Sequence, residues 1–241
     1  MAVNYNPPIV TSGLNLYLDA ANRRSYPGTG TVWVDLSGNA FNFNINASAY
    51  STSGGIPHMN FEGSFGSAKR IVNGSLTDVP FFSNATIMCF TTILNSTGNW
   101  RTLTRGASSD HQVIIEQGQN NLGMYDNNAA NFLSSGYNIT SLPNPYTRFN
   151  CLVFKLSQSS PYYDFSFNGG TSVATITNGN AAFNNGFSVI GAYHENTIGN
   201  TNVGDSSQYW GKIGCFLYYS RHLSQSEIQQ NFNALRGRFG I

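Results

Sequence analysis

A pair of carboxylates on one strand could cleave a glycan, because one carboxylate attacks the sugar while the other supplies a proton. Residues two or four positions apart on a strand share a face, so such a pair is visible as a spacing. The chain has 11 acidic residues, and two strand-like segments carry only one each, Glu116 in HQVIIEQ and Asp164 in YYDFSF. We therefore assign no catalytic residue and expect a protein without enzymatic activity.

Histidine and cysteine are the other side chains that could catalyse a reaction or bind a metal. None of the histidines stands at the spacing from Cys or Asp that a zinc site or a catalytic triad uses. Each cysteine lies in an apolar run (TIMCF, NCLVF or GCFLY), which favours a small buried side chain over a reactive thiol. The sequence therefore predicts no metal site and no cofactor. The four histidines are His58, His111, His194 and His222.

Two segments, YDNN at 125–128 and AYHENT at 192–197, combine aromatic rings with hydrogen-bonding side chains. This combination binds sugars without a metal, because the ring covers an apolar sugar face while polar groups bond its hydroxyls. An alternative interpretation stays open, in which both segments are ordinary strand ends followed by solvated turns. The candidate carbohydrate-binding residues are Tyr125, Asp126, Tyr193 and His194.

Charge and hydropathy exclude two classes of partner. Only 10% of the residues are charged and the formal net charge is +1, so there is no basic stripe for nucleic acid or for an anionic membrane surface. No window reaches the ~18 apolar residues that span a bilayer. The N-terminus, MAVNYNPPIV, lacks the basic and apolar regions of a secretory signal peptide. We expect no contact with nucleic acid or membrane.

The elements that position these residues are short strands separated by turns. GLNLYLDA alternates leucine with polar residues, as a half-buried strand does, and ATIMCFTTIL at 85–94 is apolar at nearly every position, as in a core strand. Asn168-Gly169-Gly170 suits a tight hairpin turn. About a dozen such strands predict an all-β fold, a two-sheet antiparallel sandwich.

A helix is predicted over 224–236, after the last strand at 209–220. Ser224 and Glu227 have the spacing of a capping box, and Gly237 is placed to end the helix. A helix of this length is unstable alone, so its apolar face must pack on the sandwich.

The two ends of the chain are predicted to reach neighbouring molecules. The pair Pro7-Pro8 resists regular structure, which predicts an extended arm over 1–12 and a single sandwich domain over 13–241. The residues after the helix lie beyond its predicted end. The expected assembly contacts are Tyr5, Pro7, Pro8, Phe239 and Ile241.

The sequence resembles concanavalin A-like, laminin-G-like jelly-roll domains of the bacteriophage virion-protein type. Its opening, GLNLYLDAANRRSYPGTGTVWVDLSGNAFN, is similar to theirs, and the resemblance spans nearly the whole chain. We interpret Asp19 and Asp35, which recur in that opening, as structural residues that hold turns. The C-terminal residues that carry the resemblance are Gly211, Ile213, Tyr219, Arg221, Leu223, Ser224, Glu227 and Ile228.

The resemblance implies a non-enzymatic virion structural protein on the exterior of the particle, either as capsid decoration or in association with a fibre. Its partners would be other virion proteins or further copies of itself. It would reach the virion surface from the host cytoplasm, where it is made without a signal peptide.

Two other functions stay open for this fold: a lectin-like adhesin that recognises host surface polysaccharide, and a glycan hydrolase. A galectin-like site would need His-x-Asn-x-Arg, and here Glu62 follows His58 and Asn60 where the arginine should stand. Some relatives bind calcium at a corresponding place, but EGSFGSAKR offers only Glu62 among the several oxygen ligands that calcium needs.

Overall fold

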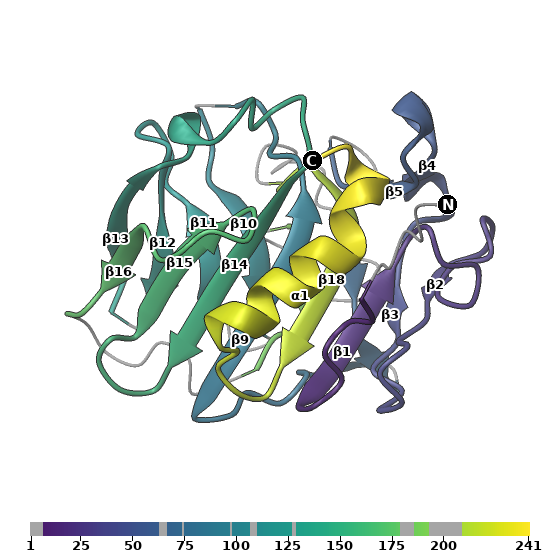
Figure 1. The fold of residues 1–241 in the computed structure, drawn as a ribbon, viewed down its shortest axis with the longest axis horizontal. Coiled ribbons are helices and arrows are strands. Elements are labelled where there is room, and N and C mark those ends of the chain that lie inside the picture. The colour runs from purple at the N-terminus through teal and green to yellow at the C-terminus, as the bar shows by residue number, and fades with distance from the viewer. Residues whose placement is uncertain are drawn as a thin grey trace.

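The computed structural model describes residues 7–62, 67–73, 75–96, 98–106, 110–126, 129–178, 186–192 and 209–241. These residues form two eight-stranded antiparallel sheets packed face to face, here called sheet A and sheet B, and one α-helix (Figure 1). The predicted jelly-roll sandwich with a short C-terminal helix is confirmed.

Sheet A contains the long central strands of the molecule. It runs in the order β16 (Ala174–Ile176), β15 (Tyr163–Phe167), β14 (Asn150–Ser157), β9 (Asn84–Thr91), β18 (Lys212–Tyr219), β5 (His58–Asn60) and β4 (Tyr50–Ser51), and β1 (Leu14–Asp19) also pairs with β18.

Sheet B is built from a four-stranded meander and four shorter strands. Its order is β13 (Asn131–Asn138), β12 (Asn121–Asp126), β11 (His111–Ile115), β10 (Arg101–Arg105), β17 (Val189–Ile190), β6 (Ala68–Lys69), β3 (Phe43–Asn44) and β2 (Val32–Trp33). A two-stranded ribbon, β7 (Ile71–Val72) with β8 (Ser75–Leu76), lies outside both sheets.

Apolar side chains from both sheets meet between them and form the main core. Ile87, Leu152 and Phe216 of sheet A belong to the same buried cluster as Trp33 and Val113 of sheet B. Inward side chains alternate with outward ones along a strand, so each sheet also presents a second face.

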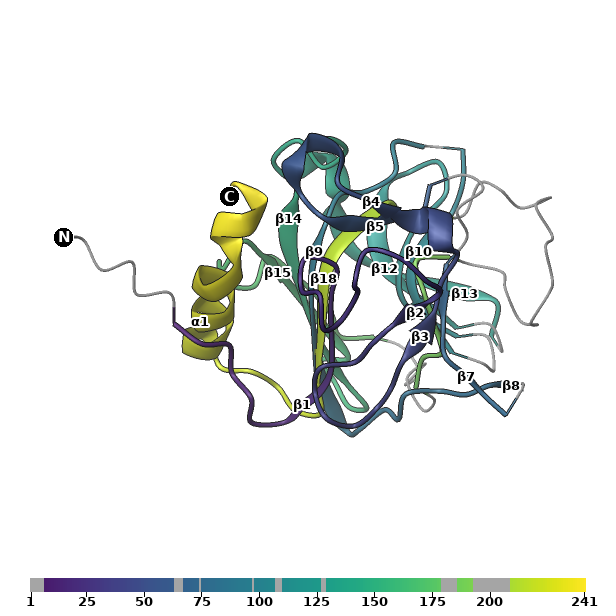
Figure 2. The ribbon, with the colours of Figure 1, turned by 90° about the vertical axis from the view of Figure 1, so that its right-hand side faces the viewer.

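The outer face of sheet A is covered by α1 (Gln225–Leu235), as the side view in Figure 2 shows. Met88, Cys151 and Leu217 point to this face and form a second buried cluster with Ile228 of the helix. Because β9, β14 and β18 are buried on both faces, nearly every position in them can be apolar. This explains the run ATIMCFTTIL, which has no period-two alternation.

The predicted start of the helix is confirmed in detail. The Ser224 side chain accepts a hydrogen bond from the Glu227 backbone N–H, and the Glu227 side chain accepts one from the Ser224 N–H. Arg221 adds two hydrogen bonds to the Glu227 carboxylate, at 2.9 and 2.6 Å. These contacts hold the pKa of Glu227 near 2, mainly through Arg221 and then through Ser224.

The α-helix ends at Leu235, within one residue of the predicted end, but Gly237 does not terminate the helical segment. A 3₁₀ turn, η6 (Arg236–Phe239), continues from α1, and the left-handed residue that terminates it is Gly240, with φ +66°, rather than Gly237. The extra turn places Phe239 against Phe90, at 4.7 Å between ring centroids. The burial of that ring accounts for the longer helical segment.

Phe239 is therefore not free to reach a neighbouring chain, which corrects the assembly prediction for this residue. It is 3% exposed and packs on Phe90 and Phe149. Ile241 is half-buried against the same cluster. Arg238 forms a 2.8 Å ion pair with Asp19 of β1, so the end of the chain is tied into the domain.

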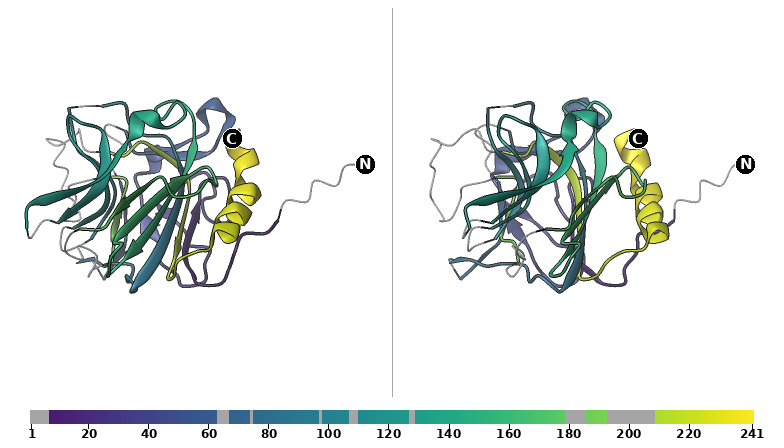
Figure 3. Two further views of the ribbon diagram at one scale, coloured as in Figure 1. Left: turned by 60° about the vertical axis from the view of Figure 1, so that its left-hand side comes forward. Right: turned by 90° about the vertical axis from the view of Figure 1, so that its left-hand side faces the viewer.

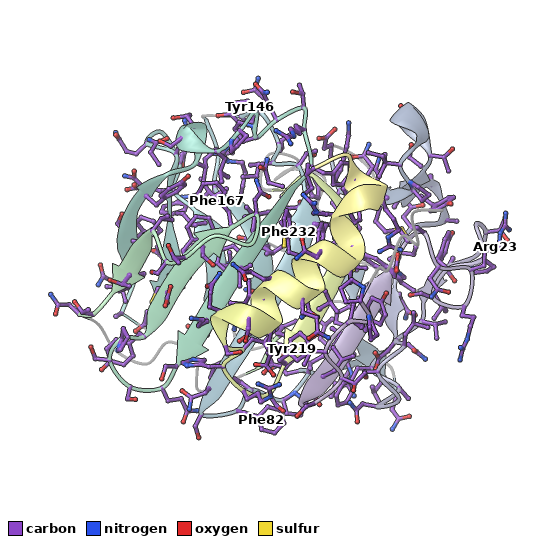
Figure 4. All side chains as sticks on the ribbon, viewed as in Figure 1. Arg23, Phe82, Tyr146, Phe167, Tyr219 and Phe232 are labelled. Atoms are coloured by element: carbon purple, nitrogen blue, oxygen red, sulfur yellow. The ribbon has the colours of Figure 1, made fainter. Side chains whose placement is uncertain are left out.

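Residues 8–12 of the predicted arm lie along α1 (Figure 3). The Val10 N–H donates to Asn231 Oδ1 at 2.7 Å, Asn231 Nδ2 donates to the Tyr219 hydroxyl at 2.9 Å, and that hydroxyl donates to the Val10 carbonyl at 2.9 Å. We call this closed ring of bonds the Val10 lock. Figure 4 labels Tyr219 and Phe232, the latter on α1. Pro7 is half-buried, Pro8 is exposed, and Tyr5 lies outside the described residues.

Asp19 and Asp35 hold turns, as predicted from their positions. Asp19 accepts the Ala21 N–H, and Asp35 accepts the backbone N–H groups of Tyr17, Ser37 and Phe41. All three cysteines are buried, and burial raises the pKa of each thiol. Within the described residues, no helix is both long enough and apolar enough to cross a membrane.

Candidate functional site

Three aromatic rings meet on the outer face of sheet B. Leu122 and Met124 of β12 point into the main core, so Tyr125 points outward. Phe132 of β13 pairs directly with Tyr125 across the strands and shares its face. The Trp100 ring centroid lies 5.4 Å from each of the other two, and all three residues are half-buried. We call Trp100, Tyr125 and Phe132 the aromatic platform.

A glycine makes the close packing of the platform possible. A Cβ atom at position 123 of β12 would lie 2.8 Å from the ring of Phe132 and 2.2 Å from the Leu133 carbonyl oxygen. Only a residue without a side chain lets the Phe132 ring lie over β12 at this distance. Tyr125 and Phe132 are therefore fixed by paired strands, which position side chains more firmly than a loop does, and Trp100 directly precedes β10.

Buried polar groups adjoin the platform. His111 of β11 is opposite Tyr125 in the strand register, and their rings stand edge to face with centroids 6.1 Å apart. His111 Nδ1 shares a 3.1 Å hydrogen bond with the Thr102 hydroxyl, and both residues are fully buried. The imidazole is therefore oriented by a neighbouring strand.

The polar character extends along β10, β11 and β17. Gln112 donates to the Gly186 carbonyl at 3.1 Å. The hydroxyls of Thr104 and Ser188 are buried and find no hydrogen-bond partner among the described residues. Buried polar atoms are usually bonded, so this side of sheet B differs from an ordinary apolar core. The further buried polar residues here are Arg105 and Asp110.

A shallow groove adjoins the platform where the edges of the two sheets meet. Its volume is about 260 Å³, and it runs between β13 and the segment that contains β16. Phe132 belongs both to the groove and to the platform, so the two surfaces are continuous. The groove is lined by Phe132, Leu133, Ser134, Thr175, Ile176, Thr177 and Asn178.

The structure places the predicted sugar-binding residues differently from one another. Tyr125 lies in the platform. Asp126 is only 7% exposed, and its Oδ1 accepts the Ala129 N–H at 3.0 Å, so it holds the turn after β12. Tyr193 and His194 lie outside the described residues.

Sequence reasoning missed Trp100, Phe132 and His111. The hairpin between β12 and β13 was the available signal, because its register sets Phe132 beside Tyr125. Among the described residues, no group of three or more His, Cys, Asp or Glu side chains is arranged to hold a metal. Residues 63–66, next to Glu62, are not described, so the expected absence of calcium stays a prediction.

No protein-family model matches the chain, and no curated protein sequence matches it. Solved structures match its fold. The receptor binding domain of a botulinum neurotoxin C/D mosaic has a TM-score of 0.62 at 14% identity, over 94% of this chain and 52% of that one. The serotype D domain, solved in complex with N-acetylneuraminic acid, has a TM-score of 0.58 at 14% identity with the same coverage.

A sialidase from Trypanosoma rangeli, in complex with the inhibitor DANA, has a TM-score of 0.59 at 15% identity, over 94% of this chain and 35% of that one. The chain thus spans about half the length of the toxin domains and about a third of the sialidase. Identities this low show a common β-sandwich fold, which many functions share. The bacteriophage type that the sequence resembles stays a prediction.

Proposed function

We propose that this protein binds carbohydrate on the aromatic platform of sheet B. The observation that carries the proposal is the cluster of three half-buried rings beside buried polar groups on the outer face of the sandwich. Full burial of the three rings would stabilise the fold more than their partial burial does. Their accessibility therefore favours a role in binding. The arrangement suits a ligand with both apolar faces and hydroxyl groups, as a sugar has.

The platform provides both kinds of contact. The ring faces of Trp100 and Tyr125 would pack against the C–H face of a pyranose. The Tyr125 hydroxyl and the Trp100 indole N–H make no hydrogen bond to a described residue, so each could bond a sugar hydroxyl. Strand pairing holds Tyr125 and Phe132, and Trp100 packs on both of their rings, so little side-chain freedom would be lost on binding.

The solved structures support this ligand class without defining it. The serotype D toxin domain was solved with N-acetylneuraminic acid, and the Trypanosoma rangeli enzymes are sialidases. We propose binding without turnover, in line with the carboxylates that stand singly in the sequence. Release of reducing sugar from host polysaccharide by the purified protein would favour the glycan hydrolase instead.

The test is a glycan array followed by titration of the best ligand. Trp100→Ala and Tyr125→Ala should each weaken binding about tenfold or more, as loss of a central aromatic contact does. Phe82→Ala is the matched control, because Phe82 is an aromatic residue that is 40% exposed outside the platform. Absence of saturable binding to any glycan, or equal affinity in all three variants, would contradict the proposal.

The virion location is a separate proposal, and the resemblance at both ends of the sequence supports it. Under this proposal the protein lies on the exterior of a phage particle, attached through other virion proteins or copies of itself, and presents the platform to host glycans. Mass spectrometry of purified particles tests the location. If the protein is absent from intact particles, the virion location is contradicted, and the carbohydrate proposal is unaffected.

A further inference from the structure

A second pocket lies on the opposite side of the sandwich, between residues of β5, β18, η2 and η6. Its volume is about 360 Å³, within the range of small-molecule sites. Its walls come from the outer face of sheet A, from η2 (Ser53–Gly55) and from η6. The lining residues are Ser53, Gly54, Ile56, His58, Thr92, Thr147, Arg148, Phe149, Lys212 and Phe239.

The charge of this pocket is entirely positive. Arg148 and Lys212 line it, and no lining residue is acidic. Neither cation forms an ion pair with a described residue, whereas Lys155, Arg221 and Arg238 each have a carboxylate partner. Two unneutralised cations in one concave site make it attractive to an anion, because a cleft with one sign of charge focuses the field.

His58 adds a polar group of fixed orientation. It is 2% exposed, and its Nδ1 lies 2.7 Å from the Ile56 carbonyl oxygen. A carbonyl only accepts, so Nδ1 carries the proton. Burial lowers the pKa of His58, and the nearby Lys212 lowers it too, although the bond to Ile56 opposes them. The charge of the pocket at neutral pH therefore comes from Arg148 and Lys212.

The shape of the pocket narrows the class of ligand. Phe149, Phe239 and Ile56 supply apolar walls. The pocket therefore favours an organic anion with a carbon skeleton over a hydrated inorganic ion. We infer that it binds a ring-sized organic oxyanion, such as a sugar unit that carries a carboxylate or a sulfate group. Arg148 and Lys212 bond the oxyanion, and the apolar walls contact the carbon skeleton. This site is distinct from the aromatic platform and does not depend on it.

The test is calorimetric titration of the purified protein with glucuronate and with glucose 6-sulfate, and with glucose as the uncharged probe. Either anion should bind saturably, and comparison of the two tells carboxylate from sulfate. Arg148→Gln and Lys212→Gln should each reduce the affinity about tenfold, because each removes one charged hydrogen bond. Arg148 is exposed, so its variant should keep the stability of the wild type.

Two controls separate this inference from the carbohydrate proposal. Arg24→Gln removes an exposed cation outside the pocket and should leave anion binding unchanged. Trp100→Ala should weaken binding at the platform and leave anion binding unchanged. The inference is overturned if neither anion binds, if glucose binds the Trp100→Ala variant as tightly as the anions do, or if the Arg148 and Lys212 variants match the wild type.

Discussion

The outer faces of the two sheets differ in composition and in what covers them. Over β9, β14 and β18 the outer face of sheet A is largely apolar, and α1, η6 and residues 8–12 bury this part with the chain's own side chains. On the outer side of sheet B, the fully buried His111 and Thr102 lie beside the half-buried rings of the aromatic platform. Side chains that are buried by the protein's own helix and arm contribute to the stability of the fold. Half-buried rings beside polar groups are instead typical of a ligand site. The two faces should therefore respond differently to substitution.

The largest expected effect is at Phe239. Phe239→Ala should lower the free energy of unfolding by about 3 to 5 kcal/mol, because it leaves a cavity between Phe90 and Phe149. The half-buried Trp100 is the comparison on the other face, and Trp100→Ala should lower it by about 1 kcal/mol. Denaturant unfolding measures both. Equal losses would remove the distinction between the buried Phe239 on sheet A and the half-buried Trp100 on sheet B.

The next effect tests the Val10 lock. Asn231→Ala should lower the free energy of unfolding by about 2 kcal/mol, because it leaves the buried Val10 N–H without an acceptor. Hydrogen exchange at Val10 should speed up in the variant, while exchange at Leu103 in the core of sheet B stays slow. If Val10 stays protected, the residues before β1 are held by other contacts.

The start of the helix should contribute less. Ser224→Ala removes the side chain that accepts the Glu227 N–H, and it should lower the free energy of unfolding by about 1 kcal/mol. Ser172 is exposed in the loop before β16 and serves as the control. Ser172→Ala should change the free energy of unfolding by only a few tenths of a kcal/mol. An unchanged midpoint for Ser224→Ala would show that the cap does not stabilise the helix in solution.

The smallest expected effect is a pH dependence from Glu227. Its folded-state pKa of about 2 lies below the value of about 4.3 expected in the unfolded chain. The unfolded state therefore takes up the proton first as the pH falls. The stabilising contribution is present above pH ~4.3 and is lost as the pH falls towards ~2. Glu227→Gln should flatten the wild-type dependence in this window, and an identical slope would assign the titration to another carboxyl.

The sequence predicted features that depend on neighbouring residues in the chain. The capping box follows from the spacing of Ser224 and Glu227, and the core strand from the composition of 85–94, observed as Asn84–Thr91. The segment TVWVDL at 31–36 is rich in apolar residues, yet only Val32–Trp33 pair as a strand, because Asp35 accepts the N–H groups of a turn.

Features that depend on distant residues were not predictable in this way. Phe239 is buried by Phe90 and Phe149, which are far from it in sequence. The local sequence RGRFGI at 236–241 therefore gave no sign of the contact. The platform likewise needs Trp100 to meet a hairpin that begins at residue 121. Tyr125 could be named from its local segment, but its ring partners come from strand pairing.

The Val10 lock also determines how the domain could be displayed. Residues 8–12 and η6 lie on the α1 side, and β12 and β13, which carry Tyr125 and Phe132 of the platform, lie on the far side of the sandwich (Figure 2). A carrier or a sensor surface coupled through either end of the chain would therefore hold the domain with sheet B turned towards solution. Coupling through the β12–β13 hairpin would instead press the platform against the support.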